Sequence, residues 1–309
     1  MSGRPDTDAT TIAWRVNFAG AVLAYVNVGA GSTAHRELVA DVATETITAD
    51  EAVEETAARH GMIIDRKYRP IIQEFDEYLI PDTPTLKSGL RDAETGSDII
   101  DADRFREVEV EISHIRLIEL AISPLIGNFD ADHYRAVHRL LFRDIFPWAG
   151  DFRIGPETAM IRFLPDAVNF EAGDPAAPLV KYSYYSGPEM ADAASVQFAQ
   201  LAEILRARGW SREVTLNRVA ESLGEFHAIH PFRDGNARAF CAFGALFGQR
   251  IGYLPDYAEY QLDSEKQVEL VHAQLNYQAT DEPAQLSQSL INADNTMPAD
   301  VRRDLTPRP

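Results

Sequence analysis

Residues 230–238 read His230-Pro-Phe-Arg-Asp-Gly-Asn-Ala-Arg238 and lie between two stretches with helical spacing of apolar residues. Val219, Leu223 and Phe226 precede His230 at steps of four, three and four, so the spacing predicts a helix that ends with His230 on its buried face. The helix that follows the turn presents its free amides and the positive end of its dipole toward this histidine. Such an arrangement is typical of an anion-binding loop.

Three side chains of this segment favour phosphate chemistry. Arg238 falls in the first turn of a helix, where a cation opposes the dipole, and pairing with a phosphate would explain its place. Asp234 can hold a divalent metal on that phosphate, and His230 can take a proton from an attacking hydroxyl. Two simpler interpretations stay open: a buried core histidine, and an Asp-Gly-Asn turn that only joins two packed helices.

Outward from this segment, the apolar spacing predicts a mostly helical chain. Thr48-Ala-Asp-Glu51 is a capping box, and Asp130 is a plausible cap of a later helix. Residues 62–100 lack a helical period, and residues 151–190 read as a short hairpin followed by a long exposed loop. Helices are expected around residues 12–26, 38–42, 48–61, 112–120, 134–145, 191–206, 214–229 and 237–250.

Composition excludes several classes of protein. The formal charge of −19, from 29 Lys plus Arg against 48 Asp plus Glu, works against direct nucleic-acid binding. A single cysteine, Cys241, excludes an internal disulfide and a thiolate zinc cluster and suits a reducing compartment. No segment has the roughly 18 apolar residues of a membrane span. We therefore expect a cytoplasmic protein without membrane contact.

The segment from His230 to Arg238 resembles the signature of the Fic family, His-x-Phe-x-Asp/Glu-Gly-Asn-Gly-Arg-x-x-Arg. The likeness spans about residues 63–270. Tyr78-Leu-Ile-Pro-Asp-Thr-Pro-Thr-Leu-Lys87 resembles the stretch that leads into the family's domain, and the stretch from Val137 through Phe146-Pro-Trp-Ala-Gly-Asp-Phe-Arg153 resembles the helix before its flap. The resemblance implies an all-α fold: a Fic-type helical bundle with a small β-hairpin flap, preceded here by a three-helix module.

The same resemblance implies a reaction, the transfer of AMP from ATP onto a Ser, Thr or Tyr hydroxyl of a target protein. His230 would be the base, and Asp234 would hold Mg²⁺. In the loop, Phe232 would be a core anchor, Arg238 would contact the phosphates, and the backbone anion hole would be formed by Gly235, Asn236 and Ala237. A flap at about residues 152–163 would hold the target by strand addition, with Arg153, Ile161 and Phe163 as its docking residues.

Two positions depart from the family signature. Ala237 stands where the family has Gly, so its Cβ either requires a helical backbone or crowds the phosphates. Cys241 stands where the family has a second Arg, and losing that cation removes a charge-assisted contact worth about 1.5–3 kcal/mol. We expect ATP to bind less well or differently. Cys241 itself also reads as a small apolar residue on a packed helix.

Residues 11–62 resemble the three-helix antitoxin that silences one class of bacterial Fic toxins. Its Ser/Thr-x-x-x-Glu-Gly/Asn segment falls at Val22-Leu-Ala-Tyr-Val26-Asn27, so both the Ser and the inhibitory Glu are Val here. Glu37, in a partial substitute on the next helix, is the other candidate. The arginine that pairs with the inhibitory Glu is replaced by Cys241, so both partners are missing together. A plain packing domain is the alternative.

These observations predict four segments: a disordered tail at 1–10, the antitoxin-like module at 11–62, a Fic domain at 63–285 and a disordered tail at 286–309. The expected activity is AMP transfer with altered regulation. Another phosphate-linked donor (UTP, GTP or a phosphocholine diester) and a non-catalytic binding module are the alternatives. By family resemblance, the target is an unidentified protein, with a type II topoisomerase subunit or the chain itself as candidates.

Overall fold

The computed structural model describes residues 8–156 and 158–293. Within them, two antiparallel strand pairs accompany the helices: β1 (Met62–Ile64) with β2 (Leu90–Asp92), and β3 (Met160–Pro165) with β4 (Leu179–Tyr184). This confirms an all-α fold with a small hairpin. The helices are α1 (Ala9–Ala24), α2 (Thr33–Ala43), α3 (Ala49–Arg59), α4 (Ala102–Ile122), α5 (Ala131–Phe142), α6 (Gly187–Arg206), α7 (Arg212–Ile229), α8 (Asn236–Arg250), α9 (Glu265–Thr280) and α10 (Ala284–Asn292), with the 3-10 turns η1 (Phe75–Tyr78) and η2 (Tyr257–Tyr260).

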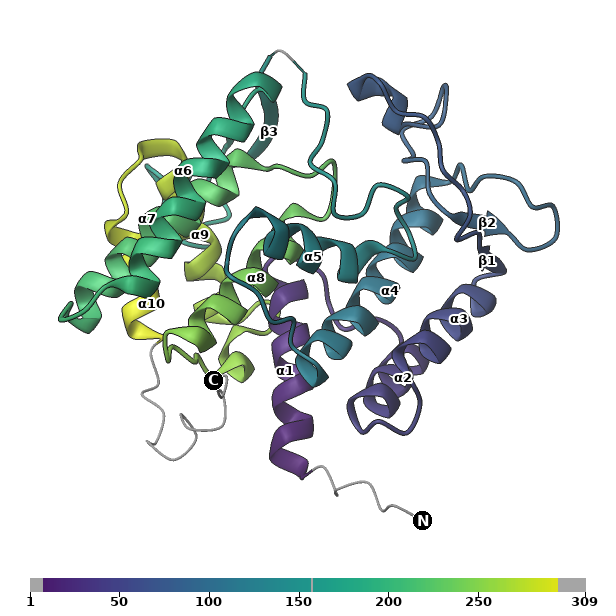
Figure 1. The fold of residues 1–309 in the computed structure, drawn as a ribbon, viewed down its shortest axis with the longest axis horizontal. Coiled ribbons are helices and arrows are strands. Elements are labelled where there is room, and N and C mark those ends of the chain that lie inside the picture. The colour runs from purple at the N-terminus through teal and green to yellow at the C-terminus, as the bar shows by residue number, and fades with distance from the viewer. Residues whose placement is uncertain (1–7, 157, 294–309) are drawn as a thin grey trace.

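Helix α4 is the structural centre of the N-terminal half, because α1, α2, α3 and α5 all pack against it (Figure 1). It is buried along much of its length, with Ile112, Ile115 and Leu117 fully buried. On the other side of the molecule α7 packs against α6, α8, α9 and α10. One cluster of buried side chains extends from Phe18 in α1 to Phe247 in α8. The first three helices therefore share the main core, as their small size predicts.

Capping side chains set several helix starts. Thr48 Oγ1 accepts from Glu51 N at 3.2 Å while Glu51 Oε2 accepts from Thr48 N at 2.8 Å, which confirms the capping box of α3. Asp130 Oδ1 accepts from His133 N at 3.0 Å and confirms the predicted cap of α5. None of the helices in the described ranges is both long and apolar enough to cross a bilayer.

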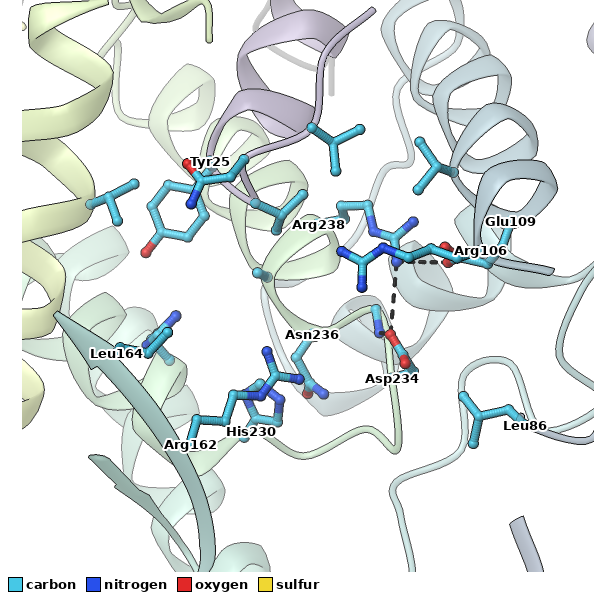
Figure 2. Close-up of a pocket in the computed structure, with 18 of the residues that line it drawn as sticks. Tyr25, Leu86, Arg106, Glu109, Arg162, Leu164, His230, Asp234, Asn236 and Arg238 are labelled. Carbon is cyan, nitrogen blue, oxygen red and sulfur yellow. Dashed lines mark hydrogen bonds and ion pairs between the residues drawn. The ribbon is translucent and has the colours of Figure 1, made fainter. Parts of the chain in front are cut away.

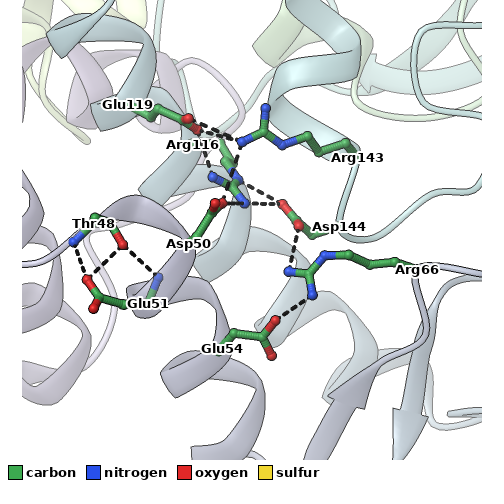
Figure 3. A network of polar contacts seen from close by, with 9 residues as sticks. All are labelled: Thr48, Asp50, Glu51, Glu54, Arg66, Arg116, Glu119, Arg143 and Asp144. Atoms are coloured by element: carbon green, nitrogen blue, oxygen red, sulfur yellow. Dashed lines mark hydrogen bonds and ion pairs between the residues drawn. The ribbon is translucent and has the colours of Figure 1, made fainter.

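A buried arginine joins three helices. The side chain of Arg116 in α4 is fully buried and contacts three carboxylates (Figure 3). Its Nε donates to Asp144 Oδ2 at 2.7 Å, just after α5, and Nη2 donates to Asp50 Oδ1 at 2.7 Å, in the first turn of α3. Nη1 donates to Glu119 Oε2 at 2.8 Å one turn along α4. Arg143, which is partly exposed, reaches Asp50 and Glu119 from the rim.

Three expectations need correction. The long loop does not follow the hairpin but lies inside it, between β3 and β4, so the flap is wider than residues 152–163. Residues 166–178 are held against α9, where Asn276 Nδ2 donates to Ala167 O at 2.8 Å. The tail predicted for 286–309 is wrong for 286–292, which belong to α10 and bury Leu286. At the other end α1 begins at Ala9, inside the tail expected at 1–10. Residues 1–7 and 294–309 lie outside the described residues.

Candidate active site

His230 directly follows α7 and caps that helix with a left-handed backbone, φ 51°. Its side chain is buried at 6% exposure, and its ring centroid lies 4.3 Å from that of Tyr184 in β4. Burial, followed by the nearby charge of Arg162, lowers the pKa of His230 well below its ordinary value. Its Nδ1 has no hydrogen-bond partner among the described residues. His230 is therefore a neutral imidazole at pH 7, the form that can accept a proton.

The loop after His230 is closed by the side chain of Asn236. Asn236 Oδ1 accepts from Phe232 N at 2.8 Å, and Nδ2 donates to Phe232 O at 2.7 Å. Phe232 is fully buried and stacks on His138 of α5 with centroids 3.8 Å apart, which confirms it as a core anchor. His138 Nδ1 accepts from Gly150 N at 2.9 Å, so its Nε2 carries the proton and donates to Asp234 O at 2.9 Å.

The turn at Gly235 brings the start of α8 to the loop. Gly235 has φ 74°, and a Cβ there would meet the ring of Phe142 at 2.4 Å, so glycine is required. Ala237 lies in the first turn of α8, with the helical backbone that its Cβ demands. The first amides of a helix have no intrahelical acceptor, and those of Asn236 and Ala237 are at the cavity described next.

A cavity of about 520 Å³ lies in front of this loop. It is bounded by the residues after α1, by α4, by β3 of the hairpin, by α9 and by the start of α8 (Figure 2). His230 and Arg162 lie together at one end (Figure 2). Asp234, Arg106 and Arg238 lie together at the other (Figure 2). The structure thus brings the predicted base, metal ligand and phosphate-binding residues to one cavity.

Arg238 is held by partners on α4. Its Nη1 donates to Ser113 Oγ at 2.8 Å, and its Nη2 lies 2.6 Å from Glu109 Oε1 and 3.8 Å from Asp234 Oδ1. The guanidinium also lies over the ring of Phe142. Glu109 is buried, and burial raises its pKa although the Arg238 charge acts in the opposite direction. Part of the charge of Arg238 is therefore already balanced by the protein.

Two other cations face the cavity. Arg106 of α4 and Arg162 of β3 are exposed and line its wall. Neither forms an ion pair within the described ranges. Asp234 is partly exposed, and its Oδ1 accepts from Gly235 N at 2.5 Å. Its Oδ2 forms no hydrogen bond or ion pair within the described ranges, so a hard carboxylate ligand is available at this end of the cavity.

The predicted docking residues of the flap divide into two groups. Ile161 and Phe163 point away from the cavity and are 47% and 65% exposed, whereas Arg162 and Leu164, on the alternate positions of β3, line it. Arg153 is not a docking residue, because it is buried at 3% exposure. Its Nε donates to His230 O at 2.9 Å and its Nη2 to Tyr185 O at 2.7 Å, so it positions the catalytic loop.

The regulatory candidates are not gathered in one place. Val26 and Asn27, just after α1, line the cavity. Val22 and Cys241 line a separate apolar cavity of about 140 Å³, and Tyr25 contributes to the walls of both. Burial raises the pKa of Cys241, so its thiol is protonated at neutral pH. Glu37 is exposed on α2 and lies outside the wall of either cavity.

Sequence reasoning missed several residues of the site. Glu109 and Ser113 hold Arg238 from a helix more than a hundred residues earlier, and no local spacing signals that contact. Arg106 and Arg162 look like ordinary surface cations in the sequence. The alternation along residues 160–165 could have indicated that Arg162 and Ile161 face opposite ways.

Part of this chain is similar to known proteins. Residues 128–247 match the model of the Fic/DOC family. Protein adenylyltransferase VbhT of Bartonella schoenbuchensis is 30% identical over 182 residues, which cover 59% of this chain and 32% of that protein. Probable protein adenylyltransferase y4lH of Sinorhizobium fredii is 32% identical over 142 residues, 45% of this chain and 59% of that protein. The chain thus spans about a third of the first relative and 59% of the second.

Solved structures agree on the fold. The BepC protein of Bartonella tribocorum, with bound AMPPNP, superposes with a TM-score of 0.53 at 20% identity, over 73% of this chain and 99% of that one. A Fic domain of Bartonella quintana with bound ADP gives a TM-score of 0.54 at 20% identity, over 74% of this chain and 99% of that one. The solved structures thus share the fold of this chain, and residues 128–247, which include the loop from His230 to Arg238, match the Fic/DOC family model.

Proposed function

We propose that this chain transfers AMP from ATP to a hydroxyl group of a protein. The observation that carries the proposal is the neutral, buried His230 in the same cavity as the first amides of α8. A hydroxyl oxygen attacks the α-phosphorus, a new oxygen–phosphorus bond forms, and pyrophosphate leaves while His230 accepts the hydroxyl proton. The adenylyltransferase names of the relatives support this reaction.

Binding of a nucleotide without transfer is the second candidate. It is favoured by the pairing of Arg238 with Glu109 and by the absence of a second signature arginine at Cys241, since both lower the positive charge offered to a triphosphate. UTP, GTP or a phosphocholine diester as donor is a variant of the first proposal.

Mass spectrometry of intact protein and of lysate tests these alternatives. The chain is incubated separately with labelled ATP, UTP and GTP, and transfer of AMP to a protein is the expected result. A variant with His230 replaced, run beside the wild type, distinguishes transfer by this site from background labelling. Saturable ATP binding with no labelled protein under any condition would favour the binding module.

Mg²⁺ is the metal that we propose for Asp234, where it would offset phosphate charge. We expect Mg²⁺ to strengthen ATP binding by roughly tenfold, about 1.4 kcal/mol, in the wild type and much less in Asp234→Asn. Calorimetry with Mg²⁺ and with a chelator measures this. Asp132→Asn, on the exposed surface of α5, is the matched control. Equal affinities with metal and with chelator in the wild type would contradict the assignment.

Arg106 is the cation that we propose to contact the terminal phosphates in place of the missing signature arginine. Arg106→Ala should weaken ATP binding by roughly tenfold and AMP binding little, because the lost contact is charge-assisted and distant from the α-phosphate. Calorimetry with each nucleotide checks this. Arg218→Ala, an exposed arginine of α7 paired with Glu221, serves as control. An equal loss of affinity for ATP and for AMP would show that Arg106 contributes only to the electrostatic potential of the cavity and does not contact the terminal phosphates.

The setting of this activity belongs to the same proposal. We infer action in the cytoplasm, where ATP is abundant and the single thiol stays reduced. The exposed Ile161 and Phe163 would face a target segment added to the free edge of β3. The candidates for that target are a type II topoisomerase subunit and the chain itself. A toxin-like role under altered control is also part of the proposal. Labelling in lysate tests both.

A further inference from the structure

A second polar cluster lies on the face of α4 that points away from the active site. Glu107 and Glu111 are one turn apart on that helix, and His60 at the end of α3 reaches them. One ligand atom from each of these three side chains lies within 4.8 Å of the others. His60 Nε2 and Glu111 Oε2 are 2.9 Å apart. Glu109, between the two glutamates, faces the opposite way and holds Arg238.

A fourth side chain enters this cluster from α2. His35 is 2% exposed, and its Nδ1 lies 4.0 Å from the same Oε2 of Glu111 without a hydrogen-bond partner among the described residues. Its other nitrogen, Nε2, lies 3.0 Å from His114 Nδ1, which fixes the ring orientation. If His35 Nε2–H donates to His114, a lone pair of Nδ1 points at the cluster. A buried nitrogen left without a partner is costly, and a cation would satisfy it.

The contact between His35 and His114 suits a metal ligand. A metal binds neutral imidazole, and a ligating histidine commonly donates its second N–H to a fixed partner. His114 is such a partner and acts as a positioning residue. Glu107 is exposed, which leaves a path from solvent to the cluster.

We propose that this His–Glu cluster binds one Zn²⁺ ion through two imidazole nitrogens and two carboxylates, those of His35, His60, Glu107 and Glu111. Two nitrogens and two oxygens match the four-coordinate preference of zinc, whereas Mg²⁺ and Ca²⁺ prefer sites made of oxygen. The ion joins α2 and α3 to α4. It therefore fastens α2 and α3 to the helix whose other face holds Arg238.

The competing interpretation is a hydrogen-bonded helix junction without metal. In that case His60 donates to Glu111, Glu107 is an ordinary surface carboxylate, and His35 Nδ1 stays unsatisfied. The two interpretations differ in whether the exposed Glu107 matters. Its removal changes nothing in a junction, but it removes a ligand from a metal site.

Titration of the full chain with ZnCl₂ alone, after removal of any tag and stripping with a chelator, tests the proposal. We expect one Zn²⁺ per chain by calorimetry and elemental analysis, together with a higher Tm. Loss of a hydrogen-bonded partner of a metal ligand already costs about 10- to 100-fold in affinity, so Glu107→Gln should cost at least that much. Glu55→Gln, on the exposed side of α3, is the matched control and should bind as the wild type does.

Further variants separate this cluster from the active site. Asp234→Asn should retain the Zn²⁺, since Asp234 lies at the cavity on the other face of α4. With Co²⁺ as the probe, His35→Gln should change the visible absorption of the bound ion, and if that variant does not fold, Glu107→Gln decides alone. Absence of stoichiometric Zn²⁺ binding, equal affinity in Glu107→Gln and wild type, or loss of binding in Asp234→Asn would each overturn the proposal.

Discussion

His230→Asn should lower the rate of AMP transfer by about 10²- to 10⁴-fold while leaving nucleotide binding and Tm close to those of the wild type. The loss follows because the proton of the attacking hydroxyl would no longer have an acceptor. Asparagine is chosen because the position has φ 51°, a conformation that Asn tolerates better than most residues. The measurement is the initial rate of label transfer at saturating ATP, beside calorimetry for ATP affinity.

A histidine outside the cavity provides the control for this prediction. His272 of α9 bonds to the carbonyl of Phe170, and His272→Asn should transfer AMP at nearly the wild-type rate. Equal rates for the wild type and His230→Asn would remove His230 from the mechanism. A large loss of ATP affinity in His230→Asn would show that His230 contributes to ATP binding and not only to accepting the proton of the attacking hydroxyl.

Arg116→Met should lower the free energy of unfolding by about 3–5 kcal/mol, the usual cost of breaking a buried ion pair from one side. The substitution leaves the carboxylate of Asp144, which is 2% exposed, with only Arg66 at 3.2 Å. Urea unfolding followed by circular dichroism gives the free energy from the midpoint and slope. Because the network joins α3, α4 and α5, the loss affects the scaffold that holds both the N-terminal helices and the active-site loop.

Arg143→Met provides the comparison within the same network. Arg143 contacts Asp50 and Glu119 as well, but its side chain is 40% exposed, so its loss should cost less than about 1 kcal/mol. A similar loss in the two variants would mean that solvent reaches Arg116 and that the network is not a buried one.

Local signals in the sequence were sufficient for most helices and for the catalytic loop. Side-chain caps such as Thr48 and Asp130 act on amides three residues away, so the sequence contains both partners close together. The anion loop is equally local, since His230 and the start of α8 are separated only by a short turn. His230, Asp234 and Arg238 were expected to act together because they are close in the sequence.

Contacts between distant segments could not be predicted in this way. Arg153 looked like a surface cation of a flap, yet the fold buries it against the carbonyl of His230. The second strand of the hairpin was expected before the long loop, whereas it follows residues 166–178. That loop is held by a contact with α9, which its own turn residues do not signal. Arg238 and Glu109 likewise meet only because α4 and α8 both pack against α5.

The first helix has a consequence for any control of this protein by its N-terminal segment. Phe18, Val22 and Leu23 belong to the same buried cluster as side chains of α4 to α8, and the residues that follow α1 form part of the cavity wall. An inhibitor made as a separate chain can dissociate or be degraded while its toxin stays folded. Here removal of α1 would expose core side chains and open the cavity together. The segment is therefore a permanent part of the fold, and a signal that acts through it must shift it in place rather than release it.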